Sequence, residues 1–349
     1  MIPRIPEKRK LPGLHYAVTD DGVELPIIDI THPAFALGEI DPGDWAVRRE
    51  NHLRMTRRHE RNPAFLRRFL FGIYSRHSIL LRGVMEAQGS FLSALNTYLM
   101  KLGPENLGKG YAGRIDRKVA ASFLALKARL RLRDVSRALA LSLAPLLTAR
   151  PGRPVHMVNI AGGPASDCLN ALILLSKDHR ERLDGRSVCI HVLDLHREAP
   201  NFGRRALDAL QEERGPLHGL DVRFAHHTYD WSDTKPLTAL LEGMQPDAIV
   251  VGSSEGGLFV YGTDDAIFAN LEALHKGAPE DFVMVGSVIW DDALARANQR
   301  SLAVRTFTPD DLERLVHLAG WVAESNPDGP GNEVIRLRKH RVSAPAHGA

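Results

Sequence analysis

The stretch around residue 160 has the residue types of a ligand-binding turn. Residues 155–160 have the pattern of a buried strand, residues 161–165 are Ala, Gly, Gly, Pro and Ala, and residues 168–176 have the pattern of a helix. Small residues let a ligand approach the backbone, and the amide groups at a helix N-terminus favour a nucleotide-like ligand. We therefore interpret the turn as a ligand site; a tight turn that binds nothing is the alternative.

An acid follows the next strand-like run, at residues 188–193. Asp194 stands at the tip of this second strand, where its carboxylate is placed to accept hydrogen bonds from both hydroxyls of a ribose. It lies 32 residues after Gly162 (194 − 162), whereas the dinucleotide fingerprint has about 20 residues at this place. The intervening helix and the polar loop at residues 177–186 account for the longer spacing.

Strand-like and helix-like runs alternate through the second half of the chain. This alternation predicts an α/β fold with a mostly parallel sheet and helices on both of its faces. The strand-like runs occupy residues 155–160, 188–193, 222–224, 248–251 and 282–289.

The first 150 residues have a different pattern. Residues 1–45 are rich in Pro and Asp and are predicted to form an extended lead-in, with one or two short strands within residues 23–30. Residues 46–150 are predicted to form a mainly α-helical domain, because apolar residues recur three and four apart at residues 65–74 and 119–130.

Two prolines and a glycine at residues 151–154 then break any regular element and mark a linker. A second domain is predicted over residues 151–349. Near its end, Thr308 is a good helix N-cap, Pro309 suits the first helical position, and Gly320 ends the helix. Residues 334–338 alternate as a half-exposed last strand.

The segment from about Val155 to Arg338 resembles the class I S-adenosylmethionine-dependent methyltransferase family. In that family the first strand ends in an acid and is followed by a Gly-x-Gly-x-Gly turn. Here Asn159 stands at the acid position, and Ala161, Gly163 and Ala165 stand at the three glycine positions. The resemblance implies a Rossmann-like sheet closed by a C-terminal antiparallel hairpin, and S-adenosylmethionine as the cofactor.

The resemblance also implies where the cofactor binds. Asp230, after the third strand, is expected near the adenine amino group, and Tyr229 or Trp231 is expected to stack on the ring; ordinary packing of both aromatics is the alternative. Ser253 ends the fourth strand, which borders the methyl donor and the acceptor. The residues expected to bind the cofactor are Asn159, Ala161, Gly162, Gly163, Pro164, Asp194, Leu195, Tyr229, Asp230, Trp231 and Ser253.

Candidate catalytic residues must lie beyond the strand tips, where ligands bind in open α/β sheets. His227 follows the third strand, and Glu255 and Tyr261 follow the fourth. Glu255 is the first choice as a general base, because a carboxylate in a small, apolar loop needs a reason to be there. Methyl transfer requires a base only if the acceptor is protonated, so catalysis by proximity alone is the alternative.

Two other enzyme classes have signals in the chain. Residues 252–256 fit Gly-x-Ser-x-Gly, the nucleophile elbow of α/β-hydrolases, with Ser254 as the nucleophile, although no clear helix follows at once. A nucleic-acid methyltransferase is the other alternative, because basic residues that could grip phosphates cluster in the first half. These are Arg54, Arg57, Arg58 and Arg61, followed by Lys127, Arg129, Arg131 and Arg133. A Rossmann-like domain that has lost its cofactor is also open.

The composition excludes several classes of protein. With 44% hydrophobic and 25% charged residues the chain is an ordinary globular protein. Its two cysteines, Cys168 and Cys189, cannot form a disulfide framework or a cysteine zinc site, and we predict no metal. No secretory signal is evident, and residues 139–147 are too short an apolar run to span a bilayer, so we expect a cytoplasmic protein without membrane contact.

Charge is unevenly distributed along the chain. The first 150 residues have 25 Lys and Arg against 14 Asp and Glu, a balance of +11, and the remainder has 20 against 28, a balance of −8. An anionic partner for the first half or a set of solvated helix faces would both explain this. We expect the helical domain to cover a pocket for a small-molecule methyl acceptor or to form a homodimer.

Overall fold

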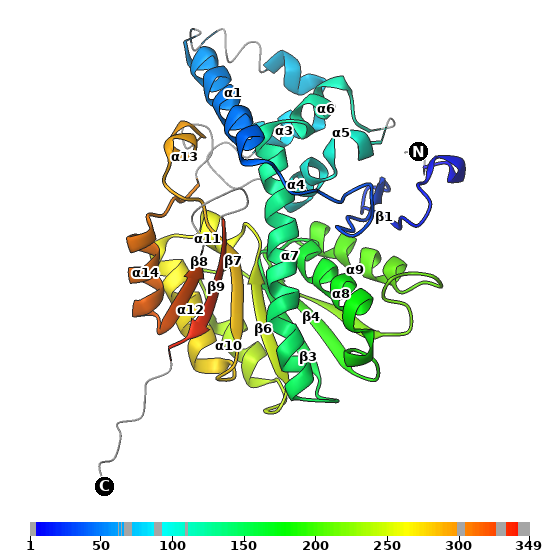
Figure 1. Cartoon of the computed structure of the whole chain (residues 1–349), viewed down its shortest axis with the longest axis vertical. Coiled ribbons are helices and arrows are strands. Elements are labelled where there is room, and N and C mark those ends of the chain that lie inside the picture. Colours follow the sequence, from blue (N-terminus) through cyan, green and yellow to red (C-terminus); the bar gives the residue numbers. More distant parts are fainter. Residues whose placement is uncertain are drawn as a thin grey trace.

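The computed structural model describes residues 5–61, 63, 65, 72–86, 93–108, 111–298, 304–325 and 333–340. Within these residues the chain forms a seven-stranded sheet between two layers of helices, with further helices above one edge of the layers (Figure 1). The helix predicted at residues 65–74 lies largely outside the described residues.

The sheet has the predicted Rossmann-like topology. Its strand order is β5-β4-β3-β6-β7-β9-β8; the first five of these strands are parallel, and β9 runs antiparallel to both β7 and β8. The predicted C-terminal antiparallel hairpin is therefore confirmed. The strands are β3 (Val155–Ile160), β4 (Ser187–Asp194), β5 (Asp221–Thr228), β6 (Ile249–Ser254), β7 (Val283–Ser287), β8 (Trp321–Ser325) and β9 (Val334–Lys339).

Alternating side chains on the strands supply two separate cores. Met157 faces the layer of α7, α8 and α9, and its neighbour Val158 faces the layer of α10, α12 and α14. Thr308 caps α14 by accepting from the Asp311 amide, and Gly320 follows with φ +86°, as predicted. The layer helices are α7 (Phe123–Ala149), α8 (Ser166–His179), α9 (Glu198–Leu210), α10 (Lys235–Glu242), α12 (Asp264–Gly277) and α14 (Pro309–Leu318).

The N-terminal region is part of the same body. An antiparallel pair, β1 (Tyr16–Val18) and β2 (Glu24–Pro26), packs beside α9, so the lead-in is more regular than predicted. The strand pair continues into buried Ile27 and Ile28, which join the core beneath α8. The helices that follow are α1 (Pro42–Glu60), α3 (Ile79–Glu86), α4 (Ala94–Lys101), α5 (Gly103–Asn106) and α6 (Arg114–Ala120).

Helix α7 ends just before the domain boundary predicted at residue 150, and it packs against the sheet that follows this boundary. It runs from the helical region down one face of the sheet (Figure 1), and Leu139, Leu143 and Leu147 are buried in the same core as Met157. The helical run predicted at residues 119–130 is also interrupted, because Ser122 caps α7 by accepting from the Ala125 amide. The sequence could not show that the last predicted helix of one domain is a layer of the other.

No helix in the described part of the chain is long and apolar enough to cross a membrane.

A row of three histidines crosses β3, β4 and β5. His156 Nδ1 lies 2.9 Å from His191 Nε2, and His191 Nδ1 lies 3.2 Å from His227 Nε2. At the end of the row, His156 Nε2 donates to Gln245 Oε1 over 2.8 Å. The Gln245 amide oxygen can only accept, so His156 Nε2 is the donor there; where the rings are neutral, each one donates through Nε2 and accepts through Nδ1.

The row predicts acid sensitivity. Burial, followed by the charges of the two neighbouring rings, lowers the pKa of His191 from 6.5 to about 4. The unfolded chain therefore takes up a proton at a higher pH than the folded chain, and stability is lost as pH falls from 6.5 towards 4. We expect the free energy of unfolding of His191→Gln to fall by up to about 3 kcal/mol less than that of the parent protein over this pH range. Urea unfolding at several pH values measures it, with exposed His77→Gln as the control; equal pH slopes in both variants would contradict the prediction.

Candidate functional site

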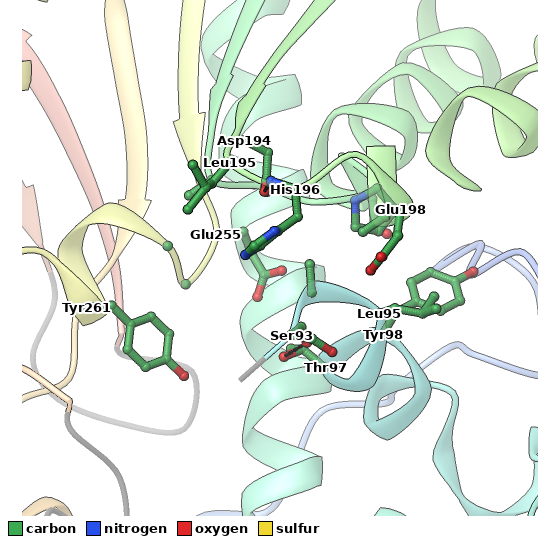
Figure 2. A pocket seen from close by; sticks show the side chains of 18 of the residues that line it. Ser93, Leu95, Thr97, Tyr98, Asp194, Leu195, His196, Glu198, Glu255 and Tyr261 are labelled. Carbon is green, nitrogen blue, oxygen red and sulfur yellow. Dashed lines mark hydrogen bonds between the residues drawn. The ribbon is translucent and has the colours of Figure 1, made fainter. Parts of the chain in front are cut away.

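A cavity of about 260 Å³ lies at the carboxyl ends of the parallel strands. Ligands bind at this edge of open α/β sheets. Figure 2 shows side chains from α4, the loops after β4 and β6, and α11 (Leu258–Tyr261) around it. The lining residues are Ser93, Ala94, Leu95, Thr97, Tyr98, Lys101, Arg131, Ala161, Gly162, Pro164, Ser166, Asp194, Leu195, His196, Glu198, Ala199, Tyr229, Asp230, Trp231, Glu255, Gly256, Gly257 and Tyr261.

The turn after β3 forms one wall of the cavity. Ala161 and Ala165 have φ angles of +53° and +51°, in the left-handed region that favours glycine. This backbone conformation explains why glycine is typical at these two positions in the family that the sequence resembles. Ala161, Gly162 and Pro164 line the cavity. Gly163 does not: its amide donates to Asp194, and a Cβ there would meet Ala94 of α4 at 2.4 Å rather than the ligand space.

Asp194 projects into the cavity from the end of β4 (Figure 2), as predicted. Its Oδ2 accepts from the Gly163 amide at 3.0 Å, and its Oδ1 accepts from the His196 amide at 3.1 Å. Burial raises the pKa of Asp194, while these two amide hydrogen bonds oppose the rise. Each carboxylate oxygen can accept a further hydrogen bond, which suits a ligand with two adjacent hydroxyls.

Asn159 and Ser253 lie behind the turn and do not line the cavity, contrary to the predicted cofactor contacts. Asn159 is fully buried, and its Nδ2 donates to Asp167 Oδ1 at 2.9 Å and to Ser253 Oγ at 2.8 Å. Burial, with the nearby charge of Glu255, raises the pKa of Asp167 to about 6. The acid that the family has at the strand end is thus replaced by a buried amide–carboxyl pair.

The loop after β5 supplies the aromatic side of the cavity. Tyr229, Asp230 and Trp231, the residues expected beside the adenine, all line it. Tyr229 is held in place because its hydroxyl donates to Asn270 Oδ1 of α12. Asp230 is exposed, and hydrogen bonds from the backbone and hydroxyl of Ser232 lower its pKa, so its carboxylate stays charged at the cavity mouth. Leu195, also 47% exposed, lines the cavity beside Asp194.

Glu255 lies in the cavity wall, but its partners oppose a role as a base. Its Oε1 accepts from Arg131 Nε at 2.8 Å, and its Oε2 accepts from Lys101 Nζ. Both carboxylate oxygens are therefore occupied by cationic partners, and neither is directed at a substrate proton. His227 does not line the cavity, because its ring belongs to the histidine row. Tyr261, on α11, is the candidate catalytic residue that does face the cavity (Figure 2).

The hydrolase alternative does not fit the structure. Ser254 is fully buried, does not line the cavity, and accepts from the Leu258 amide at 3.0 Å. Its hydroxyl therefore accepts from the first residue of α11, a four-residue helix that the sequence did not predict. A nucleophile must be reachable by its substrate, so we do not retain Ser254 in that role.

Half of the cavity wall was missed by sequence reasoning. Ser93 and Thr97 bring hydroxyls from α4, Lys101 and Arg131 bring cations from α4 and α7, and Glu198 stands at the start of α9. Their signal was weak, because α4 reaches the turn only through tertiary packing. The Gly256-Gly257 pair after β6 could have indicated a close approach to the turn after β3. A Cβ on Gly257 would lie 2.5 Å from the Ala161 Cβ.

Comparison with known proteins supports the fold. No protein-family model and no curated protein matches this chain. Among solved structures, a possible exported protein from Bordetella parapertussis is 17% identical with a TM-score of 0.52, over 86% of this chain and 98% of that chain. This likeness shows a shared fold. It does not test where the protein is located, so the cytoplasmic location stays a prediction.

Two methyltransferase structures match with lower TM-scores. A 1,6-didemethyltoxoflavin N1-methyltransferase from Burkholderia thailandensis, with bound S-adenosylhomocysteine, is 19% identical with a TM-score of 0.36, over 60% of this chain and 79% of that chain. A magnesium protoporphyrin IX methyltransferase from Synechocystis, with bound S-adenosylmethionine, is 12% identical with a TM-score of 0.39, over 63% and 85%. At these TM-scores neither likeness supports an argument about function.

The close contact of the turn with α4 is testable. Gly163 has φ +55°, and a Cβ there would lie 2.4 Å from Ala94 Cβ. We expect Gly163→Ala to lower the free energy of unfolding by about 2 kcal/mol, through backbone strain and overpacking. Ala94→Gly should reduce this penalty in the double variant, because it removes the opposing methyl group. Denaturant unfolding of the single and double variants measures the coupling; strict additivity would contradict the contact.

Proposed function

We propose that this protein is an S-adenosylmethionine-dependent methyltransferase that acts on a small molecule. One observation carries the proposal. The turn after β3, Asp194 after β4 and the Tyr229–Trp231 loop after β5 all open into one cavity. A small-residue turn, a ribose-binding carboxylate and an aromatic wall are the groups that an adenosyl cofactor with an amino-acid tail requires.

The elements that surround the cavity above the turn favour a methyl acceptor that is enclosed by the protein. Helix α4 and Arg131 of α7 close the cavity on the side opposite the sheet, and α4 packs on the turn itself. Closure of this kind excludes water and aligns two reactants, which supplies much of the rate of a methyl transfer. The predicted helical cover thus becomes a proposed part of the active site, with catalysis mainly by positioning.

The observed ion pairs disfavour a nucleic-acid substrate at the second basic cluster. Lys127 pairs with Glu333, Arg131 with Glu255, and Arg133 with Asp134. Each of these three cations is held in its own ion pair, so they do not present a continuous row of charge to successive phosphates. The first cluster is exposed, with Arg54, Arg57 and Arg58 on α1 and Arg61 directly after it. A homodimer through the N-terminal helices stays a prediction.

Cofactor binding tests the proposal directly. We expect isothermal titration calorimetry to detect both S-adenosylmethionine and S-adenosylhomocysteine. Asp194→Ala should weaken both at least tenfold, because it loses two hydrogen bonds to a charged group, each worth about 1.5–3 kcal/mol. Asp208→Ala, which removes an exposed acid of α9 that pairs with Arg204, is the matched control.

Thermal melting of the two variants separates a lost contact from a lost fold. We expect Asp194→Ala to melt at a lower temperature than the parent protein, because it loses the hydrogen bonds from the Gly163 and His196 amides, but to stay folded at the temperature of the titration while binding more weakly. Absence of binding by the unaltered protein would contradict the proposed function, and an affinity loss under twofold in Asp194→Ala would mean that another residue holds the ribose.

A further inference from the structure

An arginine with unused donors forms part of the cavity wall. The Arg131 side chain is 15% exposed, and its Nε donates to Glu255 Oε1 at 2.8 Å. Within the described part of the chain its two Nη groups have no hydrogen-bond acceptor. A guanidinium presents five donors in a fixed fork, and Arg131 lines the cavity. The unused face of Arg131 is therefore suited to an acceptor that a ligand brings.

Lys101 stands beside it and adds to the positive charge. Its ammonium is 8% exposed and contacts Glu255 Oε2, which leaves two of its three donors unused. Lys101 and Arg131 together contact one carboxylate, so their immediate group carries one excess positive charge. Glu255 is 6% exposed and has both oxygens engaged, so it orients the two cations and cannot turn away from them.

The other acids near the two cations have partners of their own. Glu333, whose charge also acts on Arg131, pairs with Lys127. Asp167 is buried behind the turn, where Asn159 holds both of its oxygens. Asp194 accepts backbone amides on the opposite wall. Glu198 and Asp230 are exposed at the mouth, where water screens their charge. Among the described residues that line the cavity, Lys101 and Arg131 are its lysine and its arginine.

We propose that Arg131 and Lys101 form a carboxylate-binding subsite in this cavity, held in position by Glu255. Charge-assisted, fork-shaped pairing of a guanidinium with a carboxylate is the strongest hydrogen bonding available to such a group. The inference rests on the proposed function for the identity of the ligand. Two sources have this chemistry: the amino-acid end of the cofactor, and an acid group on the methyl acceptor. Both would lie near the end of β6, beside Gly256, where a Cβ would meet Arg131 Nη2 at 2.7 Å.

Calorimetry with paired probes tests the subsite. S-adenosylhomocysteine carries the amino-acid carboxylate, and 5′-methylthioadenosine is the nucleoside thioether in which a methyl group replaces the whole amino-acid end. We expect Arg131→Gln to weaken S-adenosylhomocysteine at least tenfold and 5′-methylthioadenosine less than twofold, which assigns the subsite to the cofactor. Arg131→Lys should restore part of the affinity. Arg137→Gln, an exposed arginine of α7, is the matched control.

A second arm tests the acceptor as the source. If Arg131→Gln leaves the affinity for S-adenosylhomocysteine unchanged, benzoate is titrated into protein that is saturated with S-adenosylhomocysteine. Benzoate binding that is lost in Arg131→Gln assigns the subsite to the acceptor.

Two outcomes contradict the proposal. If Arg131→Gln weakens both nucleosides equally, Arg131 has a structural role. If it changes neither affinity and the unaltered protein does not bind benzoate, there is no carboxylate subsite. If the unaltered protein binds neither nucleoside, the proposed function fails, and benzoate binding to the unliganded protein decides the subsite alone. Lys101→Gln repeats the comparison if Arg131→Gln does not fold.

Discussion

The turn after β3 has room for almost no side-chain volume, and the arrangement of the site follows from this. A Cβ on Gly162 would lie 1.6 Å from Asn159 Oδ1, and one on Gly163 would lie 2.4 Å from Ala94 Cβ. The turn is therefore in close contact with three elements, because its residues leave no space for larger side chains. These are β3, α4 and the loop after β6. Because these elements meet at one point, a ligand on the free side of the turn lies within reach of all of them, and Asp194 can hold the turn through the Gly163 amide.

Buried charge then fixes the helical region to the sheet. Glu255 ends the β6 side of the cavity, and its two partners come from α4 and α7, 154 and 124 residues earlier in the chain. Removing one partner of a buried ion pair costs about 3–5 kcal/mol, because an uncompensated charge is left inside. Such a group is costly to keep for stability alone, since apolar packing serves as well. Its position on the cavity wall, with donors of Arg131 and Lys101 unused, favours a role in binding a ligand.

Sequence predicted the parts of the molecule that local pattern determines. The parallel strands, the Thr308 cap and the small-residue turn followed from periodicity and from residue type, and Asp194 followed from its place at a strand tip. The sequence could not reveal the direction in which a side chain points at the turn: Asn159 and Ser253 face a buried cluster instead of the cavity. It also could not pair Glu255 with cations far away in the chain. Tertiary packing decides both, and the same packing joins α7 to the sheet.

The central claim is that the cavity beside the β3 turn is a cofactor site shared by the sheet and the helical region. A crystal structure of the protein grown with S-adenosylhomocysteine tests it most directly. The account predicts the ribose hydroxyls on Asp194, the adenine beside Trp231, and the sulfur between the turn and the end of β6, under α4. A nucleoside bound elsewhere on the protein, or an empty cavity at saturating ligand, would contradict it.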